Sequence, residues 1–365
     1  MIHFEKKVFK ELKMGIKKFL IKTAYQRREC LKISRQEIKR FQEAVKEIWV
    51  HFNPEPEIPD CISAVDGSRN RKEFAGYILY AVGAGSVSFR KGKLSNEENY
   101  LVDVDILKPE EYSDARLRIL MGILEIKEAL KTAEKVSYVF IDGSIIGSII
   151  RPTVFSYEIE VEIKKEVEKL FKELVKNFSL SKIDSKNFYS KIENFATGKA
   201  FPVAAGYLEY LEYLYSLYLL LENFSKKIVA ISKRSDSRNY DLDTILPDIT
   251  VLNYLNLSVG FSKPVSLEIQ KEKKFSFPKP FEKELRKFSF KSYFVKLPKG
   301  AGVYKIETQV EPETLFPILK YFSIRGYPYP LKAIHEKVKI TNKDMEDIIS
   351  ILKIKGITGR EGLGE

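Results

Sequence analysis

Two apolar runs in this chain are each followed by the same tripeptide, Asp-Gly-Ser, and the two aspartates are 76 positions apart. Cys61–Val65 precedes Asp66, and Val136–Ile141 precedes Asp142. Short, uninterrupted apolar runs are typical of strands buried on both faces of a sheet. If the two strands are neighbours, their ends bring two carboxylates together, and such a pair needs a divalent cation or raises its own pKa values. Asp-Gly is also an ordinary turn signal, so each motif alone is compatible with a simple turn.

The runs around these motifs predict a mixed α/β fold. Further strands are expected at Gly76–Val82, Leu101–Ile106, Ile228–Ser232, near Ile249–Leu252, and at Val265–Ile269, Ser292–Val295 and Gly302–Val310. Helices are expected at about 110–133, 158–177, 204–224, 313–322, 330–338 and 343–354. This order of strands and helices indicates a mixed sheet, and the absence of a fixed-period repeat argues against solenoids and propellers.

The first 53 residues differ from the rest in charge and pattern. Apolar side chains recur there at spacings of three and four, which predicts a basic helical appendage over residues 3–50 that ends at Asn53-Pro54-Glu55-Pro56. The segment 1–53 holds 14 basic and 6 acidic side chains, so it carries +8 of the net +12. We expect three parts: this segment, a main domain over 58–340 with a helical insertion near 156–225, and a C-terminal helix and tail over 341–365.

Composition narrows the function classes. The chain has 365 residues, of which 44% are apolar and 31% charged, which is enough to bury a sizeable core. Two cysteines cannot build a disulfide framework or a cysteine-rich zinc site, and the lysine-broken N-terminus predicts no signal peptide. The most apolar stretch, Gly206–Leu221, carries two glutamates and five tyrosines, too polar for a membrane span. A cytoplasmic protein is expected. The basic excess favours nucleic acid as partner, although a charge-rich surface suited to high temperature is the alternative.

Other candidates lie on the predicted elements. Glu125 is flanked by Ile123, Leu124 and Ile126, where an unpaired carboxylate is costly, so it is either an ion-paired boundary residue or a third metal-site carboxylate. Lys233 follows the strand Ile228–Ser232, in a place where it could clamp a phosphate or simply be solvated.

Three more acids and one histidine complete the set. Asp248 is a weaker candidate because the neighbouring loop is rich in acids. Asp103 and Asp105 alternate with valines, as on a half-solvated strand, and are rejected as catalytic. His335 follows the aromatic turn Gly326-Tyr327-Pro328, where a lone helical histidine is usually structural. No HExxH, Walker A, GxGxxG or GxSxG motif occurs, which removes support for zinc proteases, P-loop ATPases, Rossmann dehydrogenases and serine hydrolases.

Taken in order, these motifs resemble the archaeal and bacterial NurA nucleases, partners of the HerA-type hexameric ATPase, a translocase, in DNA end resection. The resemblance rests on Asp66-Gly67-Ser68, Glu125, Asp142-Gly143-Ser144, Ser232-Lys233, Asp248 and Gly326-Tyr327-Pro328…His335, and it covers about 58–340. It implies an RNase H-like (Piwi-related) core, a homodimer, and manganese-dependent cleavage of DNA. Oxygen-only ligands suit magnesium as well as manganese, so magnesium is the other candidate ion. The resemblance further implies 5′-to-3′ exonuclease action on single- and double-stranded DNA and endonuclease action on single strands, in double-strand break repair by homologous recombination.

The resemblance also assigns roles. Asp66 and Asp142 would be metal ligands, and Glu125 a further ligand or a carboxylate that positions water. Tyr327 would contact the scissile phosphate, and His335 would transfer a proton or support the metal. Rigid carboxylates and divalent ions suit phosphodiester hydrolysis because they activate water and neutralise charge in the transition state. Arg69, Arg151 and Lys233 lie near the motif ends and are expected to hold the DNA backbone.

Two functions follow from the sequence. The first is a metal-dependent deoxyribonuclease, favoured by the ordered carboxylates. The second is a non-catalytic nucleic-acid-binding or assembly subunit of a DNA-processing complex, in which the aspartates only form turns.

Overall fold

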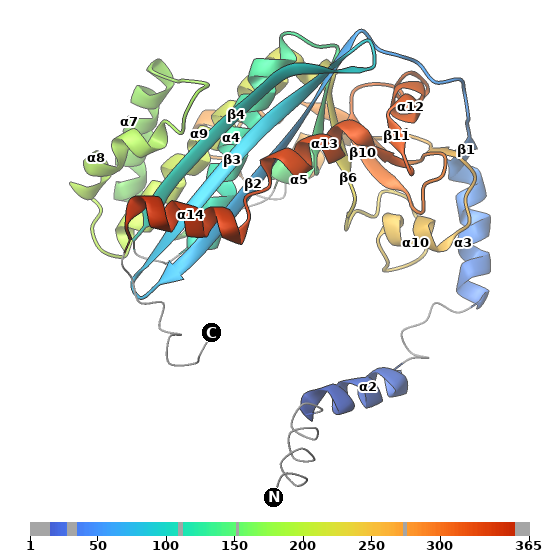
Figure 1. Ribbon diagram of the computed structural model, residues 1–365, viewed down its shortest axis with the longest axis horizontal. Coiled ribbons are helices and arrows are strands. Elements are labelled where there is room, and N and C mark those ends of the chain that lie inside the picture. Colours follow the sequence, from blue (N-terminus) through green and yellow to red (C-terminus); the bar gives the residue numbers. More distant parts are fainter. Residues whose placement is uncertain (1–14, 28–34, 109–111, 151–152, 273–275, 355–365) are drawn as a thin grey trace, which may run out of the picture.

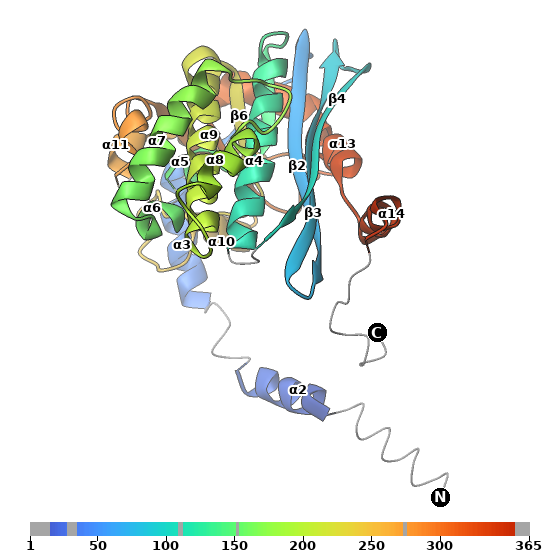
Figure 2. The same ribbon diagram turned by 90° about the vertical axis from the view of Figure 1, so that its left-hand side faces the viewer.

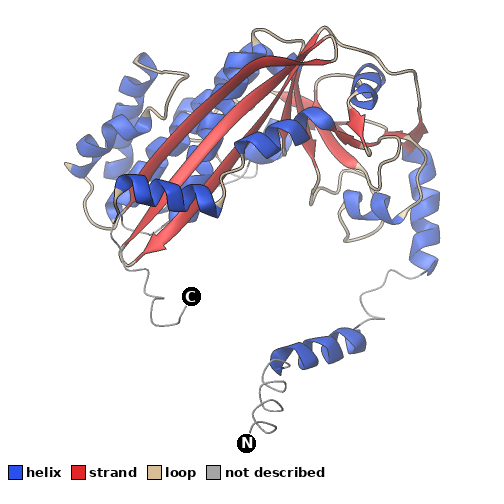
Figure 3. Cartoon of the chain, in the orientation of Figure 1, coloured by secondary structure: helices blue, strands red, loops and turns tan. Residues whose placement is uncertain are grey.

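The structure is a computed structural model that describes residues 15–27, 35–108, 112–150, 153–272 and 276–354. One large mixed sheet runs through the molecule, with helices on both of its faces (Figures 1 and 3). The predicted mixed α/β class is therefore confirmed. Among the helices of the described ranges, none has the length and hydrophobicity that a membrane-crossing segment needs.

The sheet has a parallel centre and antiparallel flanks. Its strands are β1 (Trp49–His51), β2 (Cys61–Phe74), β3 (Tyr77–Arg90), β4 (Lys93–Leu107), β5 (Tyr138–Asp142), β6 (Ile228–Ser232), β7 (Gly260–Ser262), β8 (Val265–Glu268), β9 (Ser289–Lys296) and β10 (Tyr304–Thr308). Their order is β1-β7-β9-β10-β6-β5-β2-β3-β4, with β8 paired to β9. β5 pairs in parallel with both β2 and β6, and the flanking pairs are antiparallel.

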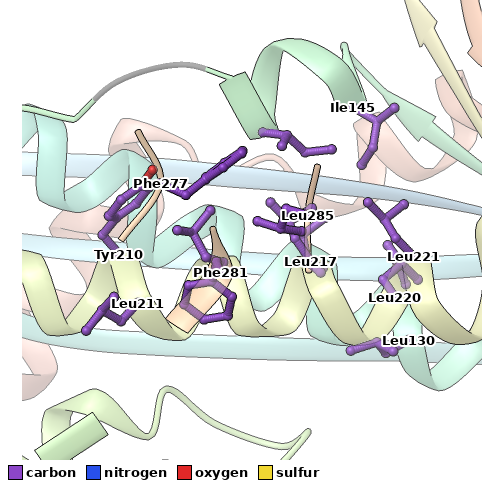
Figure 4. Close-up of a cluster of buried hydrophobic side chains, with 14 of the residues drawn as sticks. Leu130, Ile145, Tyr210, Leu211, Leu217, Leu220, Leu221, Phe277, Phe281 and Leu285 are labelled. Atoms are coloured by element: carbon purple, nitrogen blue, oxygen red, sulfur yellow. The ribbon is translucent and has the colours of Figure 1, made fainter. Parts of the chain in front are cut away.

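One face of the sheet is covered by the helices between the first and last parallel strands. They are α4 (Ser113–Ala133), α5 (Ile145–Ile150), α6 (Phe155–Glu158), α7 (Val161–Lys176), α8 (Tyr189–Glu193) and α9 (Ala200–Phe224), and two short 3₁₀ turns lie at Ser185–Phe188 and Ser225–Lys227. Figure 2 shows α4, α7, α8 and α9 together on this side. The leucines of α9 gather with Phe277, Phe281 and Leu285 in the buried core (Figure 4). The predicted helical insertion thus supplies much of the core on this face.

The other face carries the C-terminal part of the chain. Here lie α12 (Pro312–Tyr321), the ribbon of β11 (Ser323–Ile324) and β12 (Tyr327–Pro328), α13 (Tyr329–Val338) and α14 (Asn342–Leu352). The face covered by α4 and α9 also carries α10 (Asp248–Tyr254), α11 (Ile269–Glu272) and a 3₁₀ turn at Lys279–Phe281. α13 packs on β2 and β3, and its Leu331 and Ile334 join Ile62 and Ala64 of β2 in a second core. The alternation of β2 therefore places odd-numbered residues toward α4 and even-numbered residues toward α13.

The N-terminal prediction was wrong in one respect. Helices α2 (Gly15–Arg27) and α3 (Arg35–Ile48) lie within the predicted helical segment. However, α3 buries Phe41 and Val45 against α10, and β1 follows it directly and pairs with β7. α3 and β1 therefore belong to the main body and not to an appendage, because the apolar face of α3 is covered by the fold. α2 is different, since its large apolar side chains are exposed.

Two other predictions need correction. The strand expected near Ile249–Leu252 is the helix α10, whose apolar run is buried on one side by α3. The strands expected at Gly76–Val82 and Leu101–Ile106 extend to 14 and 15 residues as β3 and β4, because β2 to β4 form continuous long hairpins. Polar and glycine residues that suggested strand ends are paired inside these ladders.

Buried ion pairs tie α4 to α9. Arg116 of α4, 1% exposed, donates to Glu209 of α9 at 3.1 Å, and Tyr189 donates to the same carboxylate. One helical turn further along α9, Glu212 accepts from Lys127 at 2.6 Å. These contacts fix the register of α4, the helix that carries Glu125.

We predict that Glu209→Ala lowers the free energy of unfolding by about 3–5 kcal/mol, because Arg116 is left buried without a counter-charge. Urea titration followed by circular dichroism measures this. Glu222→Ala, which removes the surface pair between Glu222 and Lys287, serves as a matched control with a much smaller expected effect. If both variants lost the same free energy of unfolding, the buried pair of Arg116 and Glu209 would not have the structural role assigned to it.

Candidate metal centre

Asp66 and Asp142 lie side by side on neighbouring parallel strands. The register pairs Val65 of β2 with Ile141 of β5, so each aspartate is the next residue along its strand. Both side chains lie on the α13 face, since Ala64 and Phe140, two positions earlier on each strand, belong to the core beneath α13. The two strands that precede the Asp-Gly-Ser motifs are thus neighbours in the sheet, and their aspartates lie side by side.

The two motifs differ in local structure. Asp142 ends β5, and Gly143 follows with φ of 115°, a conformation that glycine adopts without strain. The turn expected after Asp66 is absent. β2 continues through Gly67 and Ser68, which pair with Ala84 and Gly83 of β3. Asp66 therefore sits where the short strand β5 stops beside the long strand β2.

His335 reaches the aspartates from α13. Its Nδ1 lies 2.8 Å from Oδ2 of Asp66. One ligand atom from each of Asp66, Asp142 and His335 lies within 4.8 Å of the other two, which is close enough to hold one metal ion. The lone helical histidine is thus part of the site.

Glu125 approaches from the opposite face of the sheet. It extends from α4 toward Gly67, and a Cβ at position 67 would lie 3.5 Å from Oε2 of Glu125 and 3.0 Å from Cγ of Met121. The missing side chain at Gly67 leaves room for the Glu125 carboxylate beside the strand. Glu125 is outside the three-residue cluster, but the charges of Asp66 and Asp142 act on it.

The electrostatics of the site favour a bound cation. Burial raises the pKa of Asp66, and the charge of Asp142 adds to the rise, while the hydrogen bond to His335 opposes it. Burial raises the pKa of Glu125 well above its usual value, with further contributions from Asp66 and Asp142. Three carboxylates that disfavour one another's charge are relieved by protons or by a divalent ion. Two carboxylates and an imidazole are a donor set that fits such an ion.

Lys233 and Tyr327 border the cluster. The Nζ of Lys233 donates to Oδ2 of Asp142 at 2.7 Å and lies 4.8 Å from the ring centre of Tyr327. The Tyr327 hydroxyl is buried and has no hydrogen-bond partner among the described residues. Burial, then the charges of Asp142 and Asp66, raises the pKa of Tyr327, so its hydroxyl stays protonated and can donate.

Glu307 is a residue that the sequence did not reveal. It lies on β10, is 1% exposed, and accepts from the Ser144 hydroxyl at 2.8 Å and the Ile146 amide at 3.0 Å. Lys305 pairs with it at 2.7 Å. These bonds secure the turn that follows Asp142. The run Gly302–Val310 predicted only a strand, and no local signal marks Glu307 as a support for position 142.

The remaining predicted residues lie elsewhere or are engaged by other groups. Arg69 donates to the Asp114 carbonyl at 3.0 Å, beyond the cluster along β2. The Asp248 carboxylate accepts from the amide of Asn239 at 2.6 Å and secures the loop before α10. Asp103 binds Lys186 and Tyr80, which agrees with its rejection. Arg151 lies outside the described residues.

These features define a site on the sheet, between β2 and β5, at which two aspartates, one imidazole and one ammonium converge, as in enzymes that hold a divalent metal. The NurA domain family model matches residues 61–340, so the chain belongs to the NurA family, a family of nucleases.

Named relatives agree over most of the chain. It is 28% identical over 315 residues to the DNA double-strand break repair nuclease NurA of Sulfurisphaera tokodaii, covering 86% of this chain and 87% of the relative. It is 29% identical over 328 residues to the protein of that name from Saccharolobus solfataricus, covering 87% and 88%.

Solved structures share the fold. The NurA nuclease of Sulfolobus solfataricus superposes with a TM-score of 0.67 at 23% identity, covering 95% of this chain and 96% of that one. A NurA solved with manganese superposes with a TM-score of 0.68 at 18% identity, covering 94% and 99%.

The raised pKa of Glu125 predicts a stability effect with a defined sign. A carboxyl whose pKa is higher in the folded than in the unfolded protein binds protons in the folded state, so its contribution to stability is present at low pH and lost as pH rises. Glu125→Gln should therefore raise the Tm of the metal-free protein at pH 8 by roughly 1–2 °C. Differential scanning calorimetry in EDTA measures this, and an unchanged or lower Tm would contradict a raised pKa of Glu125 in the folded protein.

The same shifts predict the pH dependence of metal binding. Because the pKa of Asp66 is raised, protons compete with the metal at a higher pH than they would for an ordinary aspartate. In a His335→Asn variant, in which no imidazole competes with the metal for protons, Mn²⁺ affinity followed by isothermal titration calorimetry should begin to fall at a higher pH than an ordinary aspartate would cause. A fall only at the pH of an ordinary aspartate would show that Asp66 ionises as it does in water.

Proposed function

We propose that this chain is a divalent-metal-dependent deoxyribonuclease whose metal is held by Asp66, Asp142 and His335, with Glu125 as a further ligand or as the carboxylate that positions water. The single observation that carries the proposal is the convergence of Asp66, Asp142 and His335 within 4.8 Å. A bound divalent ion supplies activation of water and neutralisation of charge on the phosphate. The solved NurA structures with manganese, and with dAMP and manganese, support this chemistry for the family.

The protein groups have separate tasks in this proposal. Asp66 orients the His335 ring through the bond to Nδ1. Tyr327 donates its hydroxyl to a phosphate oxygen, a role that its buried and unpartnered O–H within the described residues supports. Lys233 and Arg69 hold the DNA backbone without reading bases. Asp248 is left out because its carboxylate is engaged by the loop before α10.

Manganese is the ion we propose. Carboxylate oxygens suit both Mg²⁺ and Mn²⁺, whereas an imidazole nitrogen suits transition metals better than it suits Mg²⁺. The presence of His335 in the cluster therefore favours Mn²⁺.

We predict that Asp66→Asn and Asp142→Asn each lower the rate of DNA cleavage by about 10³-fold or more, since each loses several kcal/mol of transition-state stabilisation. The measurement is cleavage of end-labelled DNA with Mn²⁺, Mg²⁺ or EDTA. Asp103→Asn is the matched control, because Asp103 lies on β4, away from the cluster, and is ion-paired to Lys186. Binding of DNA by the wild type without any cleavage would favour the alternative of a binding or assembly subunit.

The finer activity follows the family. We propose 5′-to-3′ exonuclease action on single- and double-stranded DNA and endonuclease action on single strands, as a homodimer acting with a HerA-type hexameric ATPase in end resection and homologous recombination repair. Relatives named as double-strand break repair nucleases support the repair role. The pattern of products from 5′- and 3′-labelled strands gives the polarity, and addition of the ATPase to linear duplex shows whether it stimulates resection.

A further inference from the structure

In this structure the acidic cluster already has a cationic neighbour. The ammonium of Lys233 lies 2.7 Å from Oδ2 of Asp142, one of the three groups that approach within 4.8 Å of one another. Asp66 faces His335, and Glu125 has its pKa raised by burial and by the two aspartates. The ammonium is thus the one permanent positive charge that the described residues place on a carboxylate of the cluster.

The position of Lys233 allows it to leave. It follows the last residue of β6, the strand beside β5, and its side chain is 45% exposed. Within the described residues it also lies 4.8 Å from the ring centre of Tyr327. A lysine on a strand end with a flexible stem keeps many conformations open, so its ammonium can reach solvent or a phosphate by rotation alone.

The neighbouring pair of Lys305 and Glu307 shows the contrast. Both side chains are buried, at 7% and 1% exposure, and Glu307 is held by further bonds to the turn after Asp142. Removing that lysine from its partner would leave a buried charge unpaired. Of the two lysines, Lys233 is the one that can exchange its partner.

A divalent ion and the Lys233 ammonium cannot both hold the same oxygen at short range, because two like charges a few ångströms apart repel strongly where water is partly excluded. We propose that Lys233 and the divalent metal compete for Asp142, so that metal binding releases the ammonium to the DNA phosphate. This inference rests on the proposed nuclease function. Lys233 keeps the metal-free carboxylates compensated and becomes a phosphate-binding group only in the metal-loaded enzyme.

Metal binding in the absence of DNA tests the competition directly. The Mn²⁺ dissociation constant of the full chain is measured by isothermal titration calorimetry and by the electron paramagnetic resonance of free Mn²⁺. Lys233→Met, which keeps a stem of similar length without the charge, should bind Mn²⁺ on the order of tenfold more tightly, equivalent to about 1.4 kcal/mol. Lys233→Arg keeps the charge and should bind as the wild type does.

A matched control removes a comparable lysine elsewhere. Lys287 is 48% exposed and pairs with Glu222 of α9 on the helical face, so Lys287→Met should leave Mn²⁺ affinity unchanged. The second readout is the KM for DNA at saturating Mn²⁺. It should rise severalfold in Lys233→Met, since a phosphate contact is lost, while Lys287→Met keeps the wild-type value.

The outcomes separate this inference from the proposed function. A wild type that cleaves DNA, together with a Lys233→Met variant that binds Mn²⁺ equally or more weakly, overturns the competition alone. Weaker binding would further show that Lys233 helps to position Asp142. Tighter Mn²⁺ binding by Lys233→Met in a protein that cleaves no DNA upholds the competition and overturns the nuclease. A wild type that binds no Mn²⁺ overturns both.

Discussion

The repulsion between Asp66 and Asp142 is the constraint around which the rest of the site is arranged. The parallel pairing of β2 with β5 places the two carboxylates one residue beyond the Val65–Ile141 pair, on one face of the sheet. A sheet register cannot relax to separate them, because a slip of one residue would turn every side chain of the strand to the other face. The charges must instead be compensated from outside the strands, by an imidazole, an ammonium, protons or a metal ion.

Both faces of the sheet take part in that compensation. α13 brings His335 to Asp66 on one face. From the other face α4 presents Glu125 beside Gly67, where a side chain would close the gap. The buried pairs between α4 and α9 hold together the two helices of this face, one of which carries Glu125. The core beneath α13, with Leu331 and Ile334 against β2, likewise holds the helix that carries His335.

Two lysines on adjacent strand positions serve different purposes. The register pairs Lys305 of β10 with Ser232, the residue before Lys233. Lys305 is buried with Glu307 and supports the turn after Asp142, whereas Lys233 is exposed and touches Asp142 itself. The buried pair of Lys305 and Glu307, which is costly to break, thus supports the turn. The exposed pair of Lys233 and Asp142 costs little to rearrange, so Lys233 can change its partner.

Local sequence signals by themselves located several strands of the sheet and two residues of the site. Continuous apolar runs located β2, β5 and β6, and the Asp-Gly-Ser tripeptides that follow the first two runs located both aspartates, because buried strands leave strong local patterns. The same signals could not determine what lies across space. Whether Gly67 begins a turn depends on its pairing with β3, and whether Ile249–Leu252 is a strand or a helix depends on the apolar face of α3. The bonds from Lys233 to Asp142 and from Glu307 to the following turn join residues 91 and 163 positions apart. Such contacts leave no periodicity in the chain, so only tertiary packing decided them.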